Sequence, residues 1–258
     1  MAALFGSASL TWQVSTRWTS LLGGPRALLM QVAHPSVGAG VAEHSGFASD
    51  PFGRLQRTLD AVMVIGFGSS DQRREVLDHL DRVHARVRGV TADGDPYRAT
   101  DPDLQFWVHA TLVDTVLCIE RRYLGVLTRT ERGRLYAEST EMARALGIPD
   151  RHVPADLATF RSYMDEMNHS LVPGDQSRSV ARSVMRPGLR FVPDPMRVPL
   201  NWITIELLPR PLRRSFGYRE LAPPQLAAVR AGQAASRATA PHLPAALLRP
   251  PGARRILE

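Results

Sequence analysis

The chain has 258 residues, an apolar fraction of 44% and a formal net charge of +7. This length suits one large domain or a domain with appendages, and it is enough to bury a sizeable core. No apolar run approaches the roughly 20 residues that a membrane-spanning helix needs, which excludes an integral membrane protein.

Cysteine usage and the start of the chain narrow the class further. Cys118 is the only cysteine in the sequence, so an intramolecular disulfide and a multi-cysteine zinc or iron–sulfur site are both excluded. The first residues lack the basic start and continuous apolar core of a signal peptide. We therefore expect a cytoplasmic protein.

The basic residues do not indicate a nucleic-acid partner. All of them are arginines, and they are scattered as single residues and pairs. They are not interleaved with aromatic residues as an RNA-binding surface requires, and no helix-turn-helix pattern is present. We expect no nucleic-acid partner.

The N-terminal quarter reads as helical. A short helix is expected around Trp12 and Trp18, and Gly23-Gly24-Pro25 marks the start of a longer one, because proline favours an early helical position. An apolar face then continues to Val41. Pro35 interrupts it and predicts a kink or a short break after His34.

Two helices with aligned faces follow. The first is expected to begin at Asp50-Pro51 and to reach Gly66, with its positions 54, 57, 58, 61, 62 and 65 on one face. The second is expected to begin at Ser69, Ser70 or Asp71 and to end by Gly89. Its apolar stripe consists of Val76, Leu77, Leu80, Val83, His84 and Val87.

The remaining pattern predicts more helices and no extended strands. We expect a loop at 91–97, followed by helices at about 101–124, 130–146, 154–167, 177–185, 199–208 and 222–240 and a short turn at 211–216. The fold class is therefore all-α, with about eight helices and a Pro/Arg-rich C-terminal extension. Within a single domain, 1–258, we expect a helical core at 20–170, a helical cap at 171–240 and a loose tail at 241–258.

The two aligned faces have two interpretations, and the first of them is a ligand site. His84 shares a face with core residues, and Arg54, Arg57 and Thr58 lie on the neighbouring helix. This combination suits an anionic or metal-containing ligand, and haem in particular, which needs one axial imidazole, an apolar slot and cationic partners for its propionates. The alternative is a hydrogen-bonded core histidine with arginines paired to carboxylates such as Asp60.

Other chemistry has weaker local signals. The chain has no His-x-x-x-His pair, no Gly-x-Ser-x-Gly elbow and no phosphate-binding loop, and a di-iron carboxylate site would need two Glu-x-x-His motifs, of which the sequence has one, at 166–169. A non-haem metal site remains an alternative. It would have to be built from His34, Glu43, His44, His84 and His109.

Several stretches in this order resemble one family. They are GPRALLMQVAHP at 24–35, Glu43-His44-Ser45, Asp50-Pro51 with RLQRT at 54–58, Val83-His84 with Arg88-Gly89, and Tyr97 through Asp101-Pro102 to WVHAT at 107–111. The series, over roughly residues 20–170, is similar to the rubber oxygenases (latex clearing proteins) and mycophenolic-acid-pathway oxygenases, a family of haem b proteins. The resemblance implies a globin-like helical core that holds haem b.

The resemblance also implies residue roles. His84 would be the axial iron ligand, with His109, His34 or His44 as alternatives, and Arg54 and Thr58 would be distal, catalytic and cofactor-binding groups. Arg57 takes the place of a lysine that can close the distal iron site in the rubber oxygenases. Because arginine stays protonated, we expect that site to be open here, with Arg57 as a catalytic group.

Three further residues complete the expected cofactor-binding set. They are Arg88, Trp107 and His109. Trp107 and His109 would line or buttress the pocket, and core packing is the alternative for Trp107.

The expected activity is that of a haem-dependent oxygenase. It would use dioxygen and an unidentified reductant on a small apolar substrate, in a pocket roofed by residues 160–215 (Phe160, Tyr163, Phe191, Trp202). Carbon–carbon double-bond cleavage, desaturation and hydroxylation all remain open, and a homodimer is one assembly considered. The rivals are a non-catalytic haem carrier or gas sensor, and a non-haem metal oxidoreductase.

Overall fold

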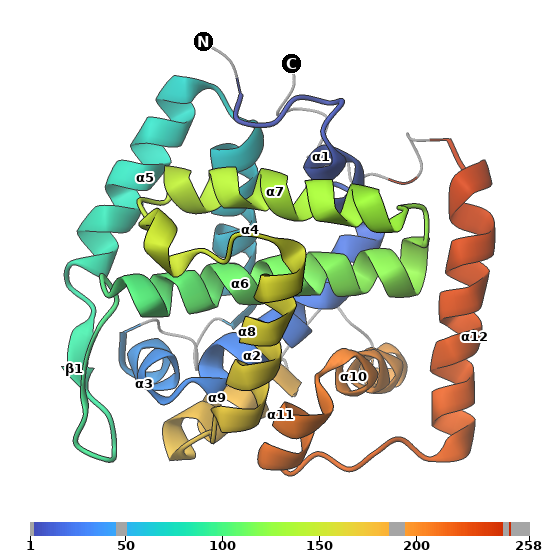
Figure 1. Ribbon diagram of the computed structural model, residues 1–258. Helices are drawn as coiled ribbons and strands as arrows, with labels where there is room; N and C mark the ends of the chain where they lie inside the picture. Colours follow the sequence, from blue (N-terminus) through green and yellow to red (C-terminus); the bar gives the residue numbers. More distant parts are fainter. Residues whose placement is uncertain (1–2, 45–50, 186–193, 245–247, 249–258) are drawn as a thin grey trace.

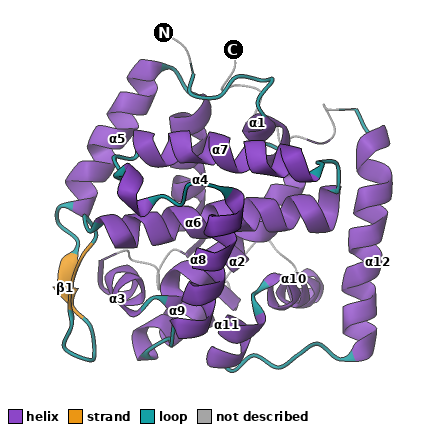
Figure 2. Cartoon of the chain, viewed as in Figure 1, coloured by secondary structure: helices purple, strands orange, loops and turns teal. Residues whose placement is uncertain are grey.

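The computed structural model describes residues 3–44, 51–185, 194–244 and 248, except for the side chains of 51–56 and 194–196. Within that part of the chain the protein is a helical bundle, as Figure 1 and Figure 2 show. The first six helices are α1 (Leu10–Ser15), α2 (Gly24–Ala33), α3 (Pro35–His44), α4 (Pro51–Phe67), α5 (Ser70–His84) and α6 (Pro102–Ile119). The others are α7 (Arg129–Ala145), α8 (Leu157–Ser170), α9 (Asp175–Met185), α10 (Asp194–Leu207), α11 (Arg210–Ser215) and α12 (Pro223–Thr239).

Short elements connect these helices. One-turn 3-10 segments are η1 (Trp18–Gly23), η3 (Asp150–His152) and η4 (Ala240–His242), and a π-helical turn, η2 (Glu120–Leu124), extends α6. The end of the predicted second helix and the loop expected at 91–97 instead form a small antiparallel hairpin of β1 (Arg88–Val90) and β2 (Pro96–Arg98), in which Gly89 pairs with Tyr97. Three residues per strand are too few for a visible alternation in the sequence.

The all-α prediction is confirmed, although the helices are more numerous than expected. The described residues form twelve α-helices rather than about eight, because short segments count separately and because Pro35 divides the second predicted helix into α2 and α3. α10 begins at Asp194, before Pro199, where the sequence pattern had placed the start. The globin-like arrangement stays a prediction.

Local capping chemistry sets the helix boundaries where the sequence indicated them. Ser69 caps α5 in a reciprocal box with Gln72, and the Asp101 carboxylate accepts a hydrogen bond from the Asp103 backbone at the start of α6. Gly147 follows α7 with φ +75°, a left-handed conformation that glycine adopts without a steric cost. These caps position the two helices, α5 and α6, that face each other across the site described below.

The hydrophobic core is centred on α6. Phe106, Trp107 and Ala110 are almost fully buried there, and α2 and α7 pack against the helix. Figure 1 shows α6 and α7 crossing the molecule side by side. The same core cluster extends from Leu10 to Ala240. The boundaries at 170 and 240 between core, cap and tail stay a prediction.

The C-terminal helices attach to this core by both apolar and polar contacts. α9 packs on α2 and α3, and α12 packs on η2 and α10. The buried Arg26 of α2 forms an ion pair with Asp114 of α6 and donates to the Leu207 backbone oxygen of α10 at 2.8 Å. Because the guanidinium is buried, these partners must remain in place for α2, α6 and α10 to stay together.

A second buried charge fixes the end of α6. Glu120 has no solvent exposure, and its carboxylate lies 2.6 Å from the Arg132 Nε and accepts a hydrogen bond from the Leu127 backbone at 2.9 Å. No helix in the described ranges is long and apolar enough to cross a lipid bilayer. The cytoplasmic location stays a prediction.

Replacing Arg132 with methionine should destabilise the protein by about 3–5 kcal/mol, because it leaves the Glu120 carboxylate buried without its cationic partner. The free energy of unfolding in urea measures the change. Arg134→Met is the matched control, since Arg134 lies on the same helix and is exposed. Equal stabilities of the two variants would contradict a structural role for the Glu120–Arg132 pair.

Candidate functional site

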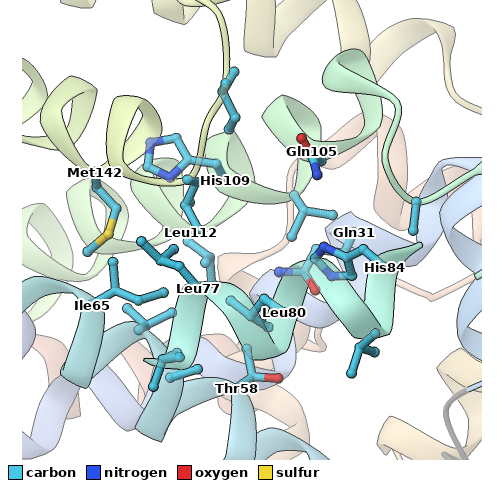
Figure 3. A pocket seen from close by; sticks show the side chains of 18 of the residues that line it. Gln31, Thr58, Ile65, Leu77, Leu80, His84, Gln105, His109, Leu112 and Met142 are labelled. Carbon is cyan, nitrogen blue, oxygen red and sulfur yellow. The ribbon is translucent and has the colours of Figure 1, made fainter. Parts of the chain in front are cut away.

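A large cavity lies between the α4–α5 hairpin and the helices α2, α3, α6 and α7. Its volume is about 1080 Å³, and most of its lining consists of apolar side chains. Figure 3 shows Leu77, Leu80 and His84 along one wall and His109 and Leu112 on another. A cavity of this size is at the upper end of the range for small-molecule sites, which is roughly 300–1,000 Å³.

The wall formed by α5 is apolar but not packed into the core. None of its 15 residues is buried, although the stripe predicted from the sequence faces the cavity throughout. Val76, Leu77 and Leu80 are partly buried against a small cluster around Phe67. Val83 is 42% exposed. An amphipathic helix normally covers its apolar face, so α5 presents a surface suited to an apolar ligand.

The α4 wall carries the predicted polar groups beside apolar ones. Arg57 and Thr58 line the cavity, followed by Ala61, Val62 and Ile65 at helical spacing. This confirms the face predicted for the described part of α4. Arg57 is exposed and Thr58 is partly buried, whereas the Arg54 side chain lies outside the described residues.

His84 is the last residue of α5 and lines the cavity. Its side chain is partly exposed and is not enclosed in the core. As a cavity-lining imidazole on an apolar helix face, it could hold a metal-containing cofactor.

His109 also lines the cavity, from α6, and Figure 3 places it beside Met142, away from His84 in that view. It is only 6% exposed. Burial lowers the pKa of His109 to about 4, and a hydrogen bond with the Ser139 backbone opposes part of that shift. His109 is therefore neutral at pH 7.

The other histidines do not form a metal site with these two. His44 lines the cavity edge, with its Nε2 3.2 Å from the Arg88 backbone oxygen, but His34 does not line the cavity. Burial lowers the pKa of His34, opposed by the charge of Asp101. Throughout the described ranges, no group of three or more His, Cys, Asp or Glu side chains is arranged to hold a metal ion. The convergence needed for a non-haem site is thus not observed there.

Two predicted cofactor-binding residues lie away from the cavity lining. Arg88 is exposed on β1, opposite Arg98, because the predicted loop is a hairpin that directs it outward. Trp107 is 0% exposed, and its Nε1 donates to the Gln31 backbone oxygen at 3.2 Å. The core-packing alternative for Trp107 is the one the structure supports.

The roof that the sequence predicted for the cavity is not formed by the described residues of that segment. The cavity lining within the described residues ends at Ile148. Phe160 packs against Tyr136 and Tyr163 packs against Phe106, with ring centroids 4.8 Å and 5.2 Å apart. Trp202 is not in the lining, and Phe191 lies outside the described residues. Phe160 and Tyr163 therefore pack in the core and not over the cavity.

Some lining residues were not predicted. Gln31 of α2, Gln105 of α6 and Met142 of α7 all contribute to the cavity surface. One signal for Gln31 is present in the sequence: it is a single polar residue within an otherwise apolar helical stretch, Leu28–Ala33. Periodicity alone could not show that the cavity lies opposite it.

The fold is helical, and one wall of its cavity, formed by α5, offers an apolar surface to a ligand. Residues 12–240 match the catalytic domain of the ER-bound oxygenase mpaB/B′ and rubber oxygenase family. Because the match covers most of the chain, the protein belongs to this family and is an oxygenase, which implies a substrate and dioxygen. The family resemblance seen in the sequence is thereby confirmed.

Relatives among curated proteins are themselves uncharacterised. One from Mycobacterium bovis and one from Mycobacterium tuberculosis are each 27% identical over 174 residues, covering 66% of this chain and 68% of the relative. No solved structure matches the chain significantly.

The buried His109 should make stability depend on pH. Its folded-state pKa of about 4 lies below the ordinary histidine value of 6.5, so the unfolded chain binds more protons between those values. The free energy of unfolding should therefore fall as the pH is lowered through this window, by about 3 kcal/mol from this residue. Urea unfolding of the wild type and of His109→Gln between pH 4 and 7.5 tests this. Identical pH slopes would contradict it.

Proposed function

We propose that this protein is a haem b-dependent oxygenase that acts with dioxygen on a small apolar substrate, and that His84 is the axial iron ligand. The observation that carries the proposal is the α5 face: an apolar helical stripe that ends in a histidine, faces a cavity of about 1080 Å³ and contains no buried residue.

The residues present fit this cofactor. A porphyrin is a large apolar plane, and the α5 stripe with Ala61 and Val62 of α4 provides an apolar surface. His84 provides an imidazole on that surface. One arginine of the cavity lining, Arg82, is exposed, where it could meet the solvated propionates.

The bound haem would supply an iron centre that activates dioxygen. The protein would supply donors of different kinds. Thr58 has a hydroxyl that can donate or accept, whereas Arg57 is a permanent cation and cannot act as an iron ligand. We propose that Thr58 and Arg57, together with Arg54, orient dioxygen and hold developing negative charge, and that the apolar lining excludes water.

Two rivals are less well supported. A haem carrier or gas sensor has no need of a large cavity beside its cofactor. The cavity of this protein is slightly larger than the usual range for a small-molecule site. A non-haem metal oxidoreductase would need converging ligands, and the described residues contain no such cluster. Substrate, reductant, reaction type and a homodimeric assembly remain open within the proposal.

An absorption spectrum of the purified chain, expressed with a haem precursor, tests the cofactor and its ligand. The wild type should show a strong Soret band that shifts on reduction with dithionite and again with carbon monoxide. His84→Ala should lose or shift this band, and added imidazole should restore part of it, because free imidazole can replace the missing ligand. His79→Ala is the matched control, since His79 lies on α5 and is exposed.

A wild-type spectrum in His84→Ala would remove His84 as the axial ligand. If His84→Ala keeps the wild-type spectrum and His109→Ala loses the Soret band, the ligand role passes to His109. No Soret band in the wild type would overturn the haem proposal as a whole.

Thr58→Val should keep haem but slow the reaction with dioxygen by about tenfold to a hundredfold, because valine matches the shape of threonine and lacks its hydroxyl donor. Stopped-flow mixing of reduced, haem-loaded protein with dioxygen measures the rate. Thr100→Val, at an exposed position, is the control. A rate equal to that of the wild type would exclude a distal role for Thr58.

A further inference from the structure

Gln31 is a buried polar residue in the cavity wall. It is 8% exposed, and it lies on α2 between Met30 and Val32, which are both 0% exposed. No hydrogen bond or ion pair within the described part of the chain engages its side-chain amide. Figure 3 shows this amide on the His84 side of the cavity, away from Met142. The amide is open to the cavity, and a polar side chain between two fully buried apolar residues is unusual for a residue that serves packing alone.

The backbone that carries the Gln31 side chain is held in place. Trp107 is fully buried in the core and donates from Nε1 to the Gln31 backbone oxygen at 3.2 Å. The α2 helix is further held by the ion pair between Arg26 and Asp114. The amide is therefore presented to the cavity by a rigid wall, which lowers the entropy lost when it binds a ligand.

The charge distribution of the lining defines what such an amide could bind. Among the described side chains of the cavity lining, the charged ones are exposed, and they are Arg57, Asp60, Glu75, Asp81 and Arg82. The buried polar groups of the lining are neutral: Gln31 is an amide, and burial keeps His109 uncharged at pH 7. A carboxylate or ammonium placed among them would be buried without a counter-charge, which is strongly unfavourable.

We propose that Gln31 determines specificity in this cavity by hydrogen bonding the carbonyl or hydroxyl oxygen of an uncharged, otherwise apolar substrate, with Trp107 as its positioning residue. The amide can donate to either kind of oxygen and can also accept from a hydroxyl. That this ligand is a substrate rests on the proposed function, whereas the binding preference of the cavity does not depend on the cofactor.

Equilibrium dialysis of the full-length chain against three matched probes tests the preference. The probes are methyl naphthyl ketone, ethylnaphthalene and naphthoate, which share a ring system. The ketone presents a carbonyl oxygen, naphthoate presents a carboxylate, and ethylnaphthalene has no oxygen. Gln31→Leu should weaken binding of the ketone about tenfold while leaving ethylnaphthalene unchanged or tighter, because only the ketone loses a hydrogen bond. Naphthoate should bind the wild type most weakly of the three.

Two controls separate binding from folding. Gln31→Leu should keep or raise the thermal unfolding midpoint, because it replaces a polar side chain by an apolar one in a wall that is otherwise apolar. Gln105→Leu removes a second amide of the lining, which is only partly buried and can remain solvated, and should change the ketone-to-hydrocarbon ratio by less than twofold.

The proposal is overturned by an unchanged ketone-to-hydrocarbon ratio in Gln31→Leu, whatever its stability, or by a ratio that follows Gln105→Leu instead. These outcomes are distinct from failure of the proposed function. A chain without a Soret band whose Gln31→Leu variant still loses ketone binding would support the Gln31 assignment and overturn the haem assignment. A normal Soret band with no change in the ratio would do the reverse.

Discussion

The arrangement of the site depends on an apolar helix face that the rest of the chain does not bury. α5 is held against α4, and the turn between the two helices is anchored by Phe67, whose ring lies 6.0 Å from that of Phe5 and 4.8 Å from that of Trp12. A backbone hydrogen bond from Phe5 to Gly66 at 2.9 Å adds to this anchor. From the anchor towards His84 the α5 stripe faces the cavity. Its apolar surface can be covered there by a ligand.

The opposite wall is rigid for a different reason. α6 is buried along most of its length, and its end is fixed by Glu120 with Arg132. α2 is fixed to it by Arg26 and by the bond from Trp107 to Gln31. One wall therefore presents polar groups at defined positions, and the other offers an apolar surface ending in an imidazole. Preorganised donors beside an apolar surface are what oxygen chemistry on an uncharged substrate requires.

Family membership and the physical description agree at the level of class. The chain is an oxygenase by its match over residues 12–240, and it has a large apolar cavity with histidines from α3, α5 and α6. Among the described residues, the cavity lining runs from Phe5 to Ile148. The C-terminal helices support it indirectly, as α9 and α10 do by packing on α2. Of the aromatic roof predicted from residues 160–215, Phe160 and Tyr163 lie in the core.

The sequence by itself determined the helical class, most helix boundaries and the family, because these depend on local caps, on helical spacing and on ordered motifs. It also determined which residues of α4 and α5 share a face. It could not decide what lies opposite a face, since periodicity is the same for a helix packed on a core and for one that borders a cavity. Only the tertiary structure placed Trp107 in the core, Arg88 at the surface and the Gln31 amide in the cavity, because each position depends on the packing of helices distant in the chain.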